Sequence, residues 1–166
     1  MPSAKYWIEH LHLEPHPEGG YFRESYRSQG IIPASGLPTY IGSRNYATCI
    51  YYLLPGNEFS AFHRLKSDEV WHFYDGCSLN LHIVLPEGTL ITKVLGKIFE
   101  TGESLQHVVP AYHWFAAKPT DSDSYSLAGC TMSPGFDVKD FELGIFEELT
   151  KQYPQHTDFI RLLVKA

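Results

Sequence analysis

His63 and Glu69 stand six residues apart in a strand–turn–strand pattern, and their side-chain types could together do acid–base chemistry. Side chains alternate between the two faces of a strand. His63 therefore shares a face with Leu65, and Glu69 shares one with Trp71. If both faces point inward, an imidazole and a carboxylate meet in an apolar pocket. A carboxylate holds an imidazole in one tautomer and raises its basicity, so the pair predicts a general base. The same two groups could also bind a metal.

Turn residues define the elements that position this pair. The pattern predicts a strand that ends near Leu65, a polar turn over residues 66–68 and a second strand over residues 69–74. Asp75-Gly76 follows, and Asp-Gly is among the strongest short signals for a hairpin. Pro55-Gly56 turns the apolar strand over residues 45–54 into the same hairpin, which we expect at the centre of the fold.

Strand signals separated by glycine and proline recur from Tyr21 to Met132. This spacing is typical of an all-β sandwich or barrel. At 166 residues the chain fits one domain, residues 1–166, with a barrel core over about residues 20–132. A Gly- and Pro-rich stretch, residues 29–44, is expected to be a loop beside the pocket. The remaining strands are predicted over residues 21–28, 79–85, 90–96, 105–109, 112–117 and 125–132.

Helices are predicted only at the two ends. Ser3 can cap a short helix that runs to about Leu11, and the two prolines and two glycines of residues 14–20 must end it. Apolar residues at helical spacing predict a second helix over residues 140–152, which Pro154 stops. Thr157 is expected to cap a last helix over residues 157–165, so that residues 138–166 form a helical tail.

The first strand of the barrel mixes aromatic and charged residues. Strand alternation places Phe22, Glu24 and Tyr26 on one face and Arg23 and Arg27 on the other. Such a strand suits a wall that both packs and binds. Aromatic residues make up 14% of the chain, which fits either a ligand cavity or a β core filled by aromatic rings.

The spacing around the central pair resembles the first motif of the cupin superfamily, with Gly56, His63, Glu69 and Gly76 in the matching positions. The second cupin motif is matched by residues 109–115, where Pro110 fits. A typical cupin has four metal ligands, and two of them are replaced here, by Leu65 and Phe115. The resemblance therefore implies the cupin barrel but neither a metal nor another cofactor.

Three further segments, in order, are similar to one cupin family known as a domain of unknown function. They are Leu13-Glu14-Pro15-His16-Pro17-Glu18-Gly19-Gly20-Tyr21-Phe22-Arg23-Glu24, residues 60–69 and residues 133–143. This resemblance covers nearly the whole chain. It implies a double-stranded β-helix, that is, a cupin jelly-roll barrel with short terminal helices, assembled as a homodimer.

A more distant similarity bears on chemistry. Gly20-Tyr21-Phe22-Arg23-Glu24 resembles a strand of the dTDP-4-dehydrorhamnose 3,5-epimerases, which are cupins without metal. That resemblance implies that Phe22 and Glu24 contact the ligand and that His63 is the base. Those enzymes also use a tyrosine as proton donor. Tyr52 and Tyr112 are the alternatives here, and the sequence does not choose between them.

Each candidate also has a purely structural interpretation. His63 could be a core histidine bonded to the backbone, and Glu69 a surface charge at the start of a strand. Trp71 and Trp114 could stack on a planar ligand or simply fill the core. His72 lies on the strand face opposite Glu69, so it is not expected to join the site. Structural roles are favoured for His82, His107, His113 and the cysteines Cys49, Cys77 and Cys130.

Charge and composition exclude several function classes. The net charge of −6 argues against nucleic acid or an anionic membrane as the main partner. The sequence has no apolar run long enough to span a bilayer, and its first residues lack the apolar core of a signal peptide. Three cysteines without paired spacing predict reduced thiols and a cytoplasmic protein.

Three functions remain open at this point. The favoured one is metal-independent isomerisation or epimerisation of a sugar or nucleotide sugar, with His63 and Glu69 as acid–base residues and Phe22, Glu24, Tyr52, Trp71 and Trp114 binding the substrate. The second is a non-catalytic binder of a small metabolite or nucleobase. The third is a metal-dependent oxygenase that uses His63, Glu69 and a further ligand.

Overall fold

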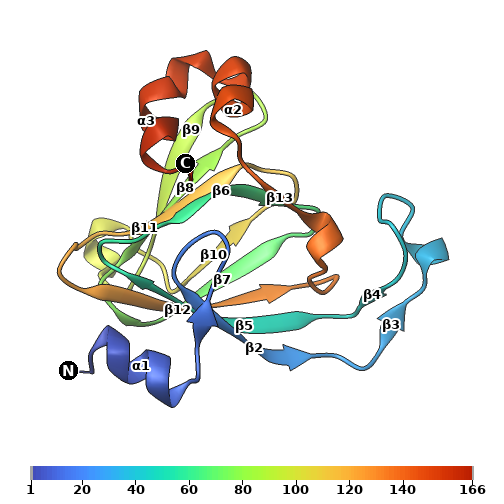
Figure 1. Ribbon diagram of the computed structural model, residues 1–166, viewed down its shortest axis with the longest axis horizontal. Helices are drawn as coiled ribbons and strands as arrows, with labels where there is room; N and C mark the ends of the chain where they lie inside the picture. Colours follow the sequence, from blue (N-terminus) through green and yellow to red (C-terminus); the bar gives the residue numbers. More distant parts are fainter. Residues whose placement is uncertain (1, 166) are drawn as a thin grey trace.

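Two antiparallel sheets face each other in the computed structural model, which describes residues 2–165 (Figure 1). The 6-stranded sheet has the order β1-β2-β5-β12-β7-β10, and the 5-stranded sheet has the order β13-β6-β11-β8-β9. The predicted all-β class is confirmed. The strands of the first sheet are β1 (Glu14–Pro15), β2 (Tyr21–Arg27), β5 (Thr48–Pro55), β7 (Glu69–Gly76), β10 (Gln106–Val109) and β12 (Tyr125–Met132); those of the second are β6 (Ser60–Leu65), β8 (Leu79–Val84), β9 (Leu90–Leu95), β11 (Phe115–Pro119) and β13 (Phe141–Leu143).

Consecutive strands in the middle of the chain cross from one sheet to the other. β6 lies in the 5-stranded sheet, β7 in the 6-stranded sheet and β8 in the 5-stranded sheet again. The expected central hairpin of β6 and β7 is therefore wrong, and Asp75-Gly76 ends a strand without forming a hairpin turn between sheet neighbours. The two strands instead face each other across the barrel, which brings His63 and Glu69 to opposite walls.

The core between the sheets follows from strand alternation. In β7 the buried residues are Glu69, Trp71 and Phe73, and in β8 Leu79, Leu81 and Ile83 are buried between the sheets, while Val84 at the end of the strand is buried under the helices. Every second side chain thus points between the sheets. Removing one such apolar side chain from water contributes roughly 1.5–3 kcal/mol, so this core stabilises the barrel around the cavity.

Short helices cover the outer faces of the sheets. Helix α1 (Ala4–His10) begins at Ser3, whose hydroxyl accepts the Tyr6 N–H as predicted, and packs on the 6-stranded sheet. Helices α2 (Phe146–Gln152) and α3 (Thr157–Leu162) pack on the 5-stranded sheet through Leu149, Ile160 and Leu163. Thr157 does not cap α3; the cap position is His156, which makes no side-chain cap. In residues 2–165 no helix has the length and apolarity needed to cross a membrane.

The C-terminal segment begins with a strand where a helix was predicted. After the 3-10 helix η3 (Val138–Asp140), β13 pairs antiparallel with β6, Phe141 opposite Leu65. The helix starts only at Phe146. Phe141 faces the barrel from a strand, and the later apolar residues face it from α2. Together they give residues 140–152 the spacing of one helix, which explains the wrong prediction.

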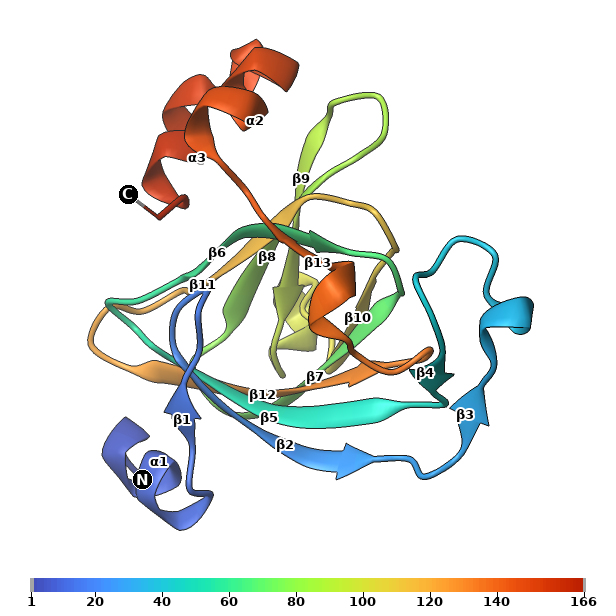
Figure 2. The ribbon, with the colours of Figure 1, turned by 45° about the vertical axis from the view of Figure 1, so that its right-hand side comes forward.

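Residues 28–47 form an arm that projects from the barrel (Figures 1 and 2). The expected loop contains two short strands, β3 (Ile31–Ile32) and β4 (Arg44–Asn45), and the 3-10 helix η1 (Ala34–Gly36) between them. Arg44 at its base forms a buried ion pair with Asp140, with Nε–Oδ2 and Nη2–Oδ1 distances of 2.6 and 2.7 Å. This pair ties the arm to η3.

A β-bulge in β2 changes which residues face the interior. Glu24 pairs with Ile50 and Tyr26 pairs with Cys49, so Ser25 is the extra residue. A bulge shifts the alternation of the strand by one residue. Phe22, Glu24 and Arg27 consequently face the cavity, whereas Tyr26 is exposed. The predicted grouping of Tyr26 with Phe22 and Glu24 is wrong for this reason.

Candidate functional site

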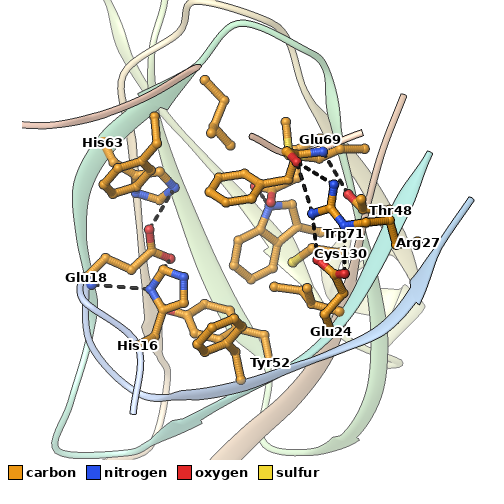
Figure 3. Close-up of a pocket in the computed structure, with 16 residues that line it drawn as sticks. His16, Glu18, Glu24, Arg27, Thr48, Tyr52, His63, Glu69, Trp71 and Cys130 are labelled. Atoms are coloured by element: carbon orange, nitrogen blue, oxygen red, sulfur yellow. Dashed lines mark hydrogen bonds and ion pairs between the residues drawn. The ribbon is translucent and has the colours of Figure 1, made fainter. Parts of the chain in front are cut away.

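A cavity of about 170 Å³ lies between the two sheets (Figure 3). Its walls come from β2, β5, β6, β7, β12 and β13 and from the turn before β2. Aromatic and aliphatic side chains line most of it. The polar and charged groups that reach it are His16, Glu18, Glu24, Arg27, Thr48, Tyr52, His63, Glu69 and Cys130.

His63 pairs with Glu18, not with Glu69. The His63 Nε2–Glu18 Oε2 distance is 3.2 Å, and both side chains are buried (Figure 3). Among the described contacts, none joins His63 to Glu69. The predicted pair therefore needs correction, because β6 and β7 lie in opposite sheets and the turn before β2 supplies the carboxylate instead.

Hydrogen bonding fixes one proton on the His63 ring. His63 Nδ1 lies 2.8 Å from the carbonyl oxygen of Ala61, which can only accept, so Nδ1 carries a hydrogen. Its Nε2 faces Glu18 Oε2 at 3.2 Å. Any positive charge on the ring would therefore be compensated by the Glu18 carboxylate beside it.

Two glycines place Glu18 in the barrel. Gly19 has φ 123° and Gly20 has φ 68°, a conformation that other residues rarely adopt. A Cβ on Gly19 would lie 2.0 Å from the carbonyl oxygen of Phe59. This close approach lets the Glu18 carbonyl accept the Ala61 N–H at 2.9 Å, and Glu18 Oε1 accepts the Ser60 hydroxyl at 2.8 Å. The sequence interpretation used this segment as a turn and as part of the family resemblance, but it gave Glu18 no role in the site.

His16 is a second imidazole beside Glu18. Its Nδ1 accepts the Glu18 backbone N–H at 3.2 Å and lies 3.8 Å from Glu18 Oε1. Burial lowers the pKa of His16, although Glu18 acts in the opposite direction. The ring packs edge-on against Phe22, with centroids 4.5 Å apart. A neutral His16 with Nδ1 as acceptor carries its proton on Nε2.

Glu69 occupies the opposite wall in an apolar setting. Its side chain is 7% exposed, and Oε2 accepts the Trp71 indole N–H at 2.8 Å. Burial, and secondarily the charge of Glu18, raise the pKa of Glu69 to about 8, while the Trp71 hydrogen bond opposes the shift. Glu69 therefore holds its proton at neutral pH. Removal from water disfavours the charged carboxylate.

Glu24 and Arg27 form a closed pair at the edge of the cavity. Arg27 Nε and Nη2 each donate to one oxygen of Glu24 at 2.8 Å. The guanidinium also donates to Asn45 Oδ1 and to the carbonyl oxygen of Phe136. Glu24 does line the cavity as predicted, but both its oxygens are already bonded to Arg27.

The predicted aromatic residues separate into two groups. Phe22, Tyr52 and Trp71 line the cavity. Tyr52 donates its hydroxyl hydrogen to the Gly19 carbonyl at 2.7 Å, and burial raises its pKa well above the usual value, so it holds its proton firmly. Trp114 is not in the cavity. It directly precedes Phe115, the first residue of β11. The Phe115 side chain points inward, so alternation directs the Trp114 side chain to the helices outside.

The other titratable candidates lie away from the cavity or are inert. Tyr112 is 51% exposed and lies in a surface groove near Trp114. His72 bonds Thr131 Oγ1, and His82 packs against Phe159, with its pKa lowered to about 4 chiefly by burial. His107 and His113 bond backbone carbonyls. Cys130 borders the cavity, and burial, followed by the nearby Glu69, raises the pKa of its thiol.

The donor set of the cavity does not fit the metal site of a typical cupin. Leu65 lies in the cavity wall, and Phe115 packs on the His63 ring with centroids 4.1 Å apart. Within residues 2–165, no three His, Cys, Asp or Glu side chains are grouped so that they could hold a metal ion. A tight transition-metal site normally needs three or four protein ligands.

Two antiparallel sheets whose successive strands alternate around one inner cavity define the cupin class of barrel. The family model described as "Cupin superfamily (DUF985)" matches residues 5–144, and the chain belongs to this family. The double-stranded β-helix predicted from the sequence is thereby confirmed, as is the resemblance that suggested it.

Relatives with similar sequences and structures extend over nearly the whole chain. Protein SO0799 of Shewanella oneidensis is 41% identical, with a TM-score of 0.89 over 99% of both chains. A hypothetical protein from Leishmania major is 35% identical, with a TM-score of 0.89 over 99% of this chain and 100% of that one. The uncharacterized protein YML079W of Saccharomyces cerevisiae is 30% identical over 148 residues, which is 83% of this chain and 73% of that protein.

A more distant likeness shows the fold alone. Oxalate decarboxylase from Bacillus subtilis shares 14% sequence identity and a TM-score of 0.55, over 90% of this chain and 36% of that one. At this identity the likeness carries no argument about chemistry.

Proposed function

We propose that this protein is a metal-independent isomerase or epimerase that moves a proton on a small carbonyl-bearing molecule. The observation that carries the proposal is the presence of two carboxyl groups in one cavity with different environments. Glu18 lies beside the His63 imidazole and accepts the Ser60 hydroxyl, whereas Glu69 is buried among apolar groups and holds its proton. Two titratable groups whose surroundings favour different protonation states are typical of an acid and a base that act together.

In this proposal Glu18 accepts the proton and Glu69 donates one. The Glu18 carboxylate removes a proton from the carbon next to the substrate carbonyl. Glu69 donates its proton to the carbonyl oxygen, which gives a neutral enol. Return of a proton to the other face or to the neighbouring carbon, and of the enol proton to Glu69, completes an epimerisation or an isomerisation. His63 is then a positioning residue that sets the charge of Glu18.

Proton exchange tests the reaction. Small ketoses, aldoses and keto acids are incubated with the protein in deuterated water, and loss of the α-proton signal is followed by NMR. General acid–base groups contribute about 10²–10⁴-fold in rate, so Glu18→Gln and Glu69→Gln should each lower exchange by that factor. Glu100→Gln, an exposed carboxylate far along the chain from both, serves as the control.

A non-catalytic binder is the second candidate. It is favoured by the saturation of His63, whose two ring nitrogens both have partners, as in a structural histidine. If a ligand binds in the cavity and the wild-type protein exchanges no proton from it, the isomerase proposal is wrong and the binder replaces it.

We also propose a cytoplasmic homodimer. The three cysteines of the described chain are free thiols, which supports a reducing compartment. Large apolar side chains are exposed on the arm, which supports self-association.

A further inference from the structure

The cation at the edge of the cavity has no hydrogen-bond donor left for a ligand. A guanidinium has five N–H groups. Arg27 Nε donates to Glu24 Oε1, and Nη2 donates to Glu24 Oε2, both at 2.8 Å. Nη1 donates to Asn45 Oδ1 at 2.9 Å, and Nη1 and Nη2 each donate to the Phe136 carbonyl at 3.1 Å. All five are used, and the charge of Arg27 is compensated by Glu24.

The inner groups also offer an entering anion no free cation. His63 is not a free cation for a ligand, because its Nδ1 is held by the Ala61 carbonyl and its Nε2 lies 3.2 Å from Glu18 Oε2. Glu69 has an indole donor and apolar neighbours instead of a cation, which keeps it protonated below pH of about 8. His16 is neutral at pH 7 because burial lowers its pKa. Lys165 lies near enough to His16 to contribute to that shift, but it is not among the described residues that line the cavity.

Neutral polar groups and aromatic faces remain for the ligand. Glu69 Oε1, the Nε2–H of His16 and the hydroxyl of Thr48 can still exchange hydrogen bonds; Thr48 Oγ1 accepts the Phe136 N–H at 2.9 Å and keeps its own hydrogen. Around these groups stand the rings of Phe22, Trp71, Phe136 and Phe141.

The size of the cavity limits the ligand to a single ring. Its volume of about 170 Å³ is below the roughly 300–1,000 Å³ of pockets that hold drug-sized ligands. Aromatic walls with a few neutral hydrogen-bonding groups suit a compact ring that carries hydroxyl, carbonyl or amide groups.

We propose that the cavity selects an uncharged, single-ring ligand and rejects phosphorylated and carboxylated ones. The proposal rests on the proposed function for the identity of the site, and it narrows the substrate class. An anion that entered would lose its water without gaining a free cation, and such burial of an unpaired charge is costly. The nucleotide sugar implied by the distant epimerase resemblance is thereby disfavoured, because no free cationic side chain among the described lining residues could bind its diphosphate.

A matched panel of small rings tests this selectivity. Each set contains a neutral polyol or lactam, the same ring with a phosphate or carboxylate, and the same ring with an amine. Binding to the full-length protein is measured by saturation-transfer NMR and calorimetry at pH 7. We expect binders only among neutral members, with each charged counterpart at least about tenfold weaker. A charged member that binds better than its neutral counterpart, or no neutral binder in the panel, would overturn the proposal.

Substitution of the residue that compensates Arg27 provides a directed test. Glu24→Gln leaves the guanidinium without a carboxylate, so affinity for the phosphorylated members should rise by about tenfold while neutral members change little. Glu142→Gln is the matched control, because it removes the carboxylate partner of Arg64, and this ion pair lies outside the cavity. Equal anion affinity in both variants and the wild type would contradict the inferred role of charge compensation.

The two proposals fail in different ways. If neutral rings bind but show no proton exchange, the selectivity stands and the isomerase function is wrong. If proton exchange occurs on a phosphorylated sugar and depends on Glu69, the function stands and the selectivity is wrong.

Discussion

At the scale of single residues, two glutamates in one cavity differ because their neighbours differ. Glu18 has the Ser60 hydroxyl and the His63 ring, both of which can stabilise a carboxylate. Glu69 has the Trp71 N–H and the weak thiol donor of Cys130, together with surrounding apolar side chains. A glutamate is thus suited to accept a proton on one wall of the cavity, and a second glutamate is suited to donate one on the other wall.

Glu69 should make the stability of the protein fall as pH rises. Its pKa is about 8 in the folded chain and 4.5 as a reference, so between these values the unfolded state loses the proton while the folded state keeps it. Titration of Glu69 therefore leaves the unfolding free energy at its full value below pH of about 4.5. Between pH of about 4.5 and about 8 it lowers that free energy, by an amount on the order of a few kcal/mol.

Glu69→Gln tests this directly. Urea denaturation measured from pH 5 to pH 8 should show a flatter pH dependence in the variant and greater stability than wild type near pH 8. Glu100→Gln should keep the wild-type slope. An unchanged slope in Glu69→Gln would mean that Glu69 is ionised in the folded protein.

Sequence alternation predicted individual residues well only where the strand is regular. Phe115 and Leu65 pointed inward as the cupin spacing implied, and the same alternation excludes Trp114 from the cavity once β11 is assigned. The bulge at Ser25 was not predictable from the pattern, so Arg27 was placed on the wrong face. Glu18 was missed because it lies in a turn, where no periodicity indicates the direction of a side chain.

At the scale of elements, the turn before β2 is the piece that completes the site. Gly19→Ala would place a Cβ 2.0 Å from the Phe59 carbonyl oxygen at a φ of 123°, so the turn must move away from β6. Backbone strain alone costs about 1–3 kcal/mol, and the clash adds to it. We expect a lower unfolding free energy by more than about 2 kcal/mol, together with loss of the His63–Glu18 pair.

Gly102→Ala is a matched control for this substitution. Gly102 also has a positive φ, 86°, but nothing lies within 4 Å of the position that a Cβ would take there. It should therefore lose only the cost of the backbone conformation, about 1 kcal/mol. Urea denaturation of both variants measures the difference, and histidine NMR reports the environment of His63. Equal destabilisation of the two variants would show that the close contact of Gly19 is unimportant.

A buried ion pair between Arg44 and Asp140 is one of the contacts that hold the arm. Removing one partner of such a pair costs about 3–5 kcal/mol, because the other charge stays buried and unpaired, whereas apolar replacement of both can be nearly neutral. The single variants Arg44→Met and Asp140→Leu should therefore each destabilise strongly, whereas the double variant Arg44→Met, Asp140→Leu should recover most of the loss. Denaturation of the wild type, both single variants and the double variant measures the coupling. Additive losses would show that the two residues do not act as a pair.

At the scale of the whole molecule, topology was the part most predictable from a family resemblance and least predictable from local pattern. Strand positions followed from alternation and turn residues, so most of them agree with the structure. Pairing did not, because a strand pattern does not reveal its partner; β6 and β7 looked like a hairpin but belong to different sheets. β13 was read as helix since three residues are too few to establish a strand period.

The arm is also where we expect two copies of the chain to meet. It projects from the barrel, and Ile31, Ile41 and Tyr46 on it are 55%, 66% and 56% exposed (Figure 2). Apolar side chains concentrated on a projecting element are typical of an interface, and a two-fold dimer would bury the same patch on both copies.

Ile41→Glu should therefore shift the protein from dimer to monomer in sedimentation-velocity experiments. A symmetric interface would bury the introduced carboxylate of both copies. Leu162→Glu is the control: Leu162 is also 66% exposed but lies on α3, on the other side of the barrel. It should leave the dimer intact. If the wild-type protein sediments as a monomer at micromolar concentration, or if Leu162→Glu dissociates it while Ile41→Glu does not, the arm is not the interface.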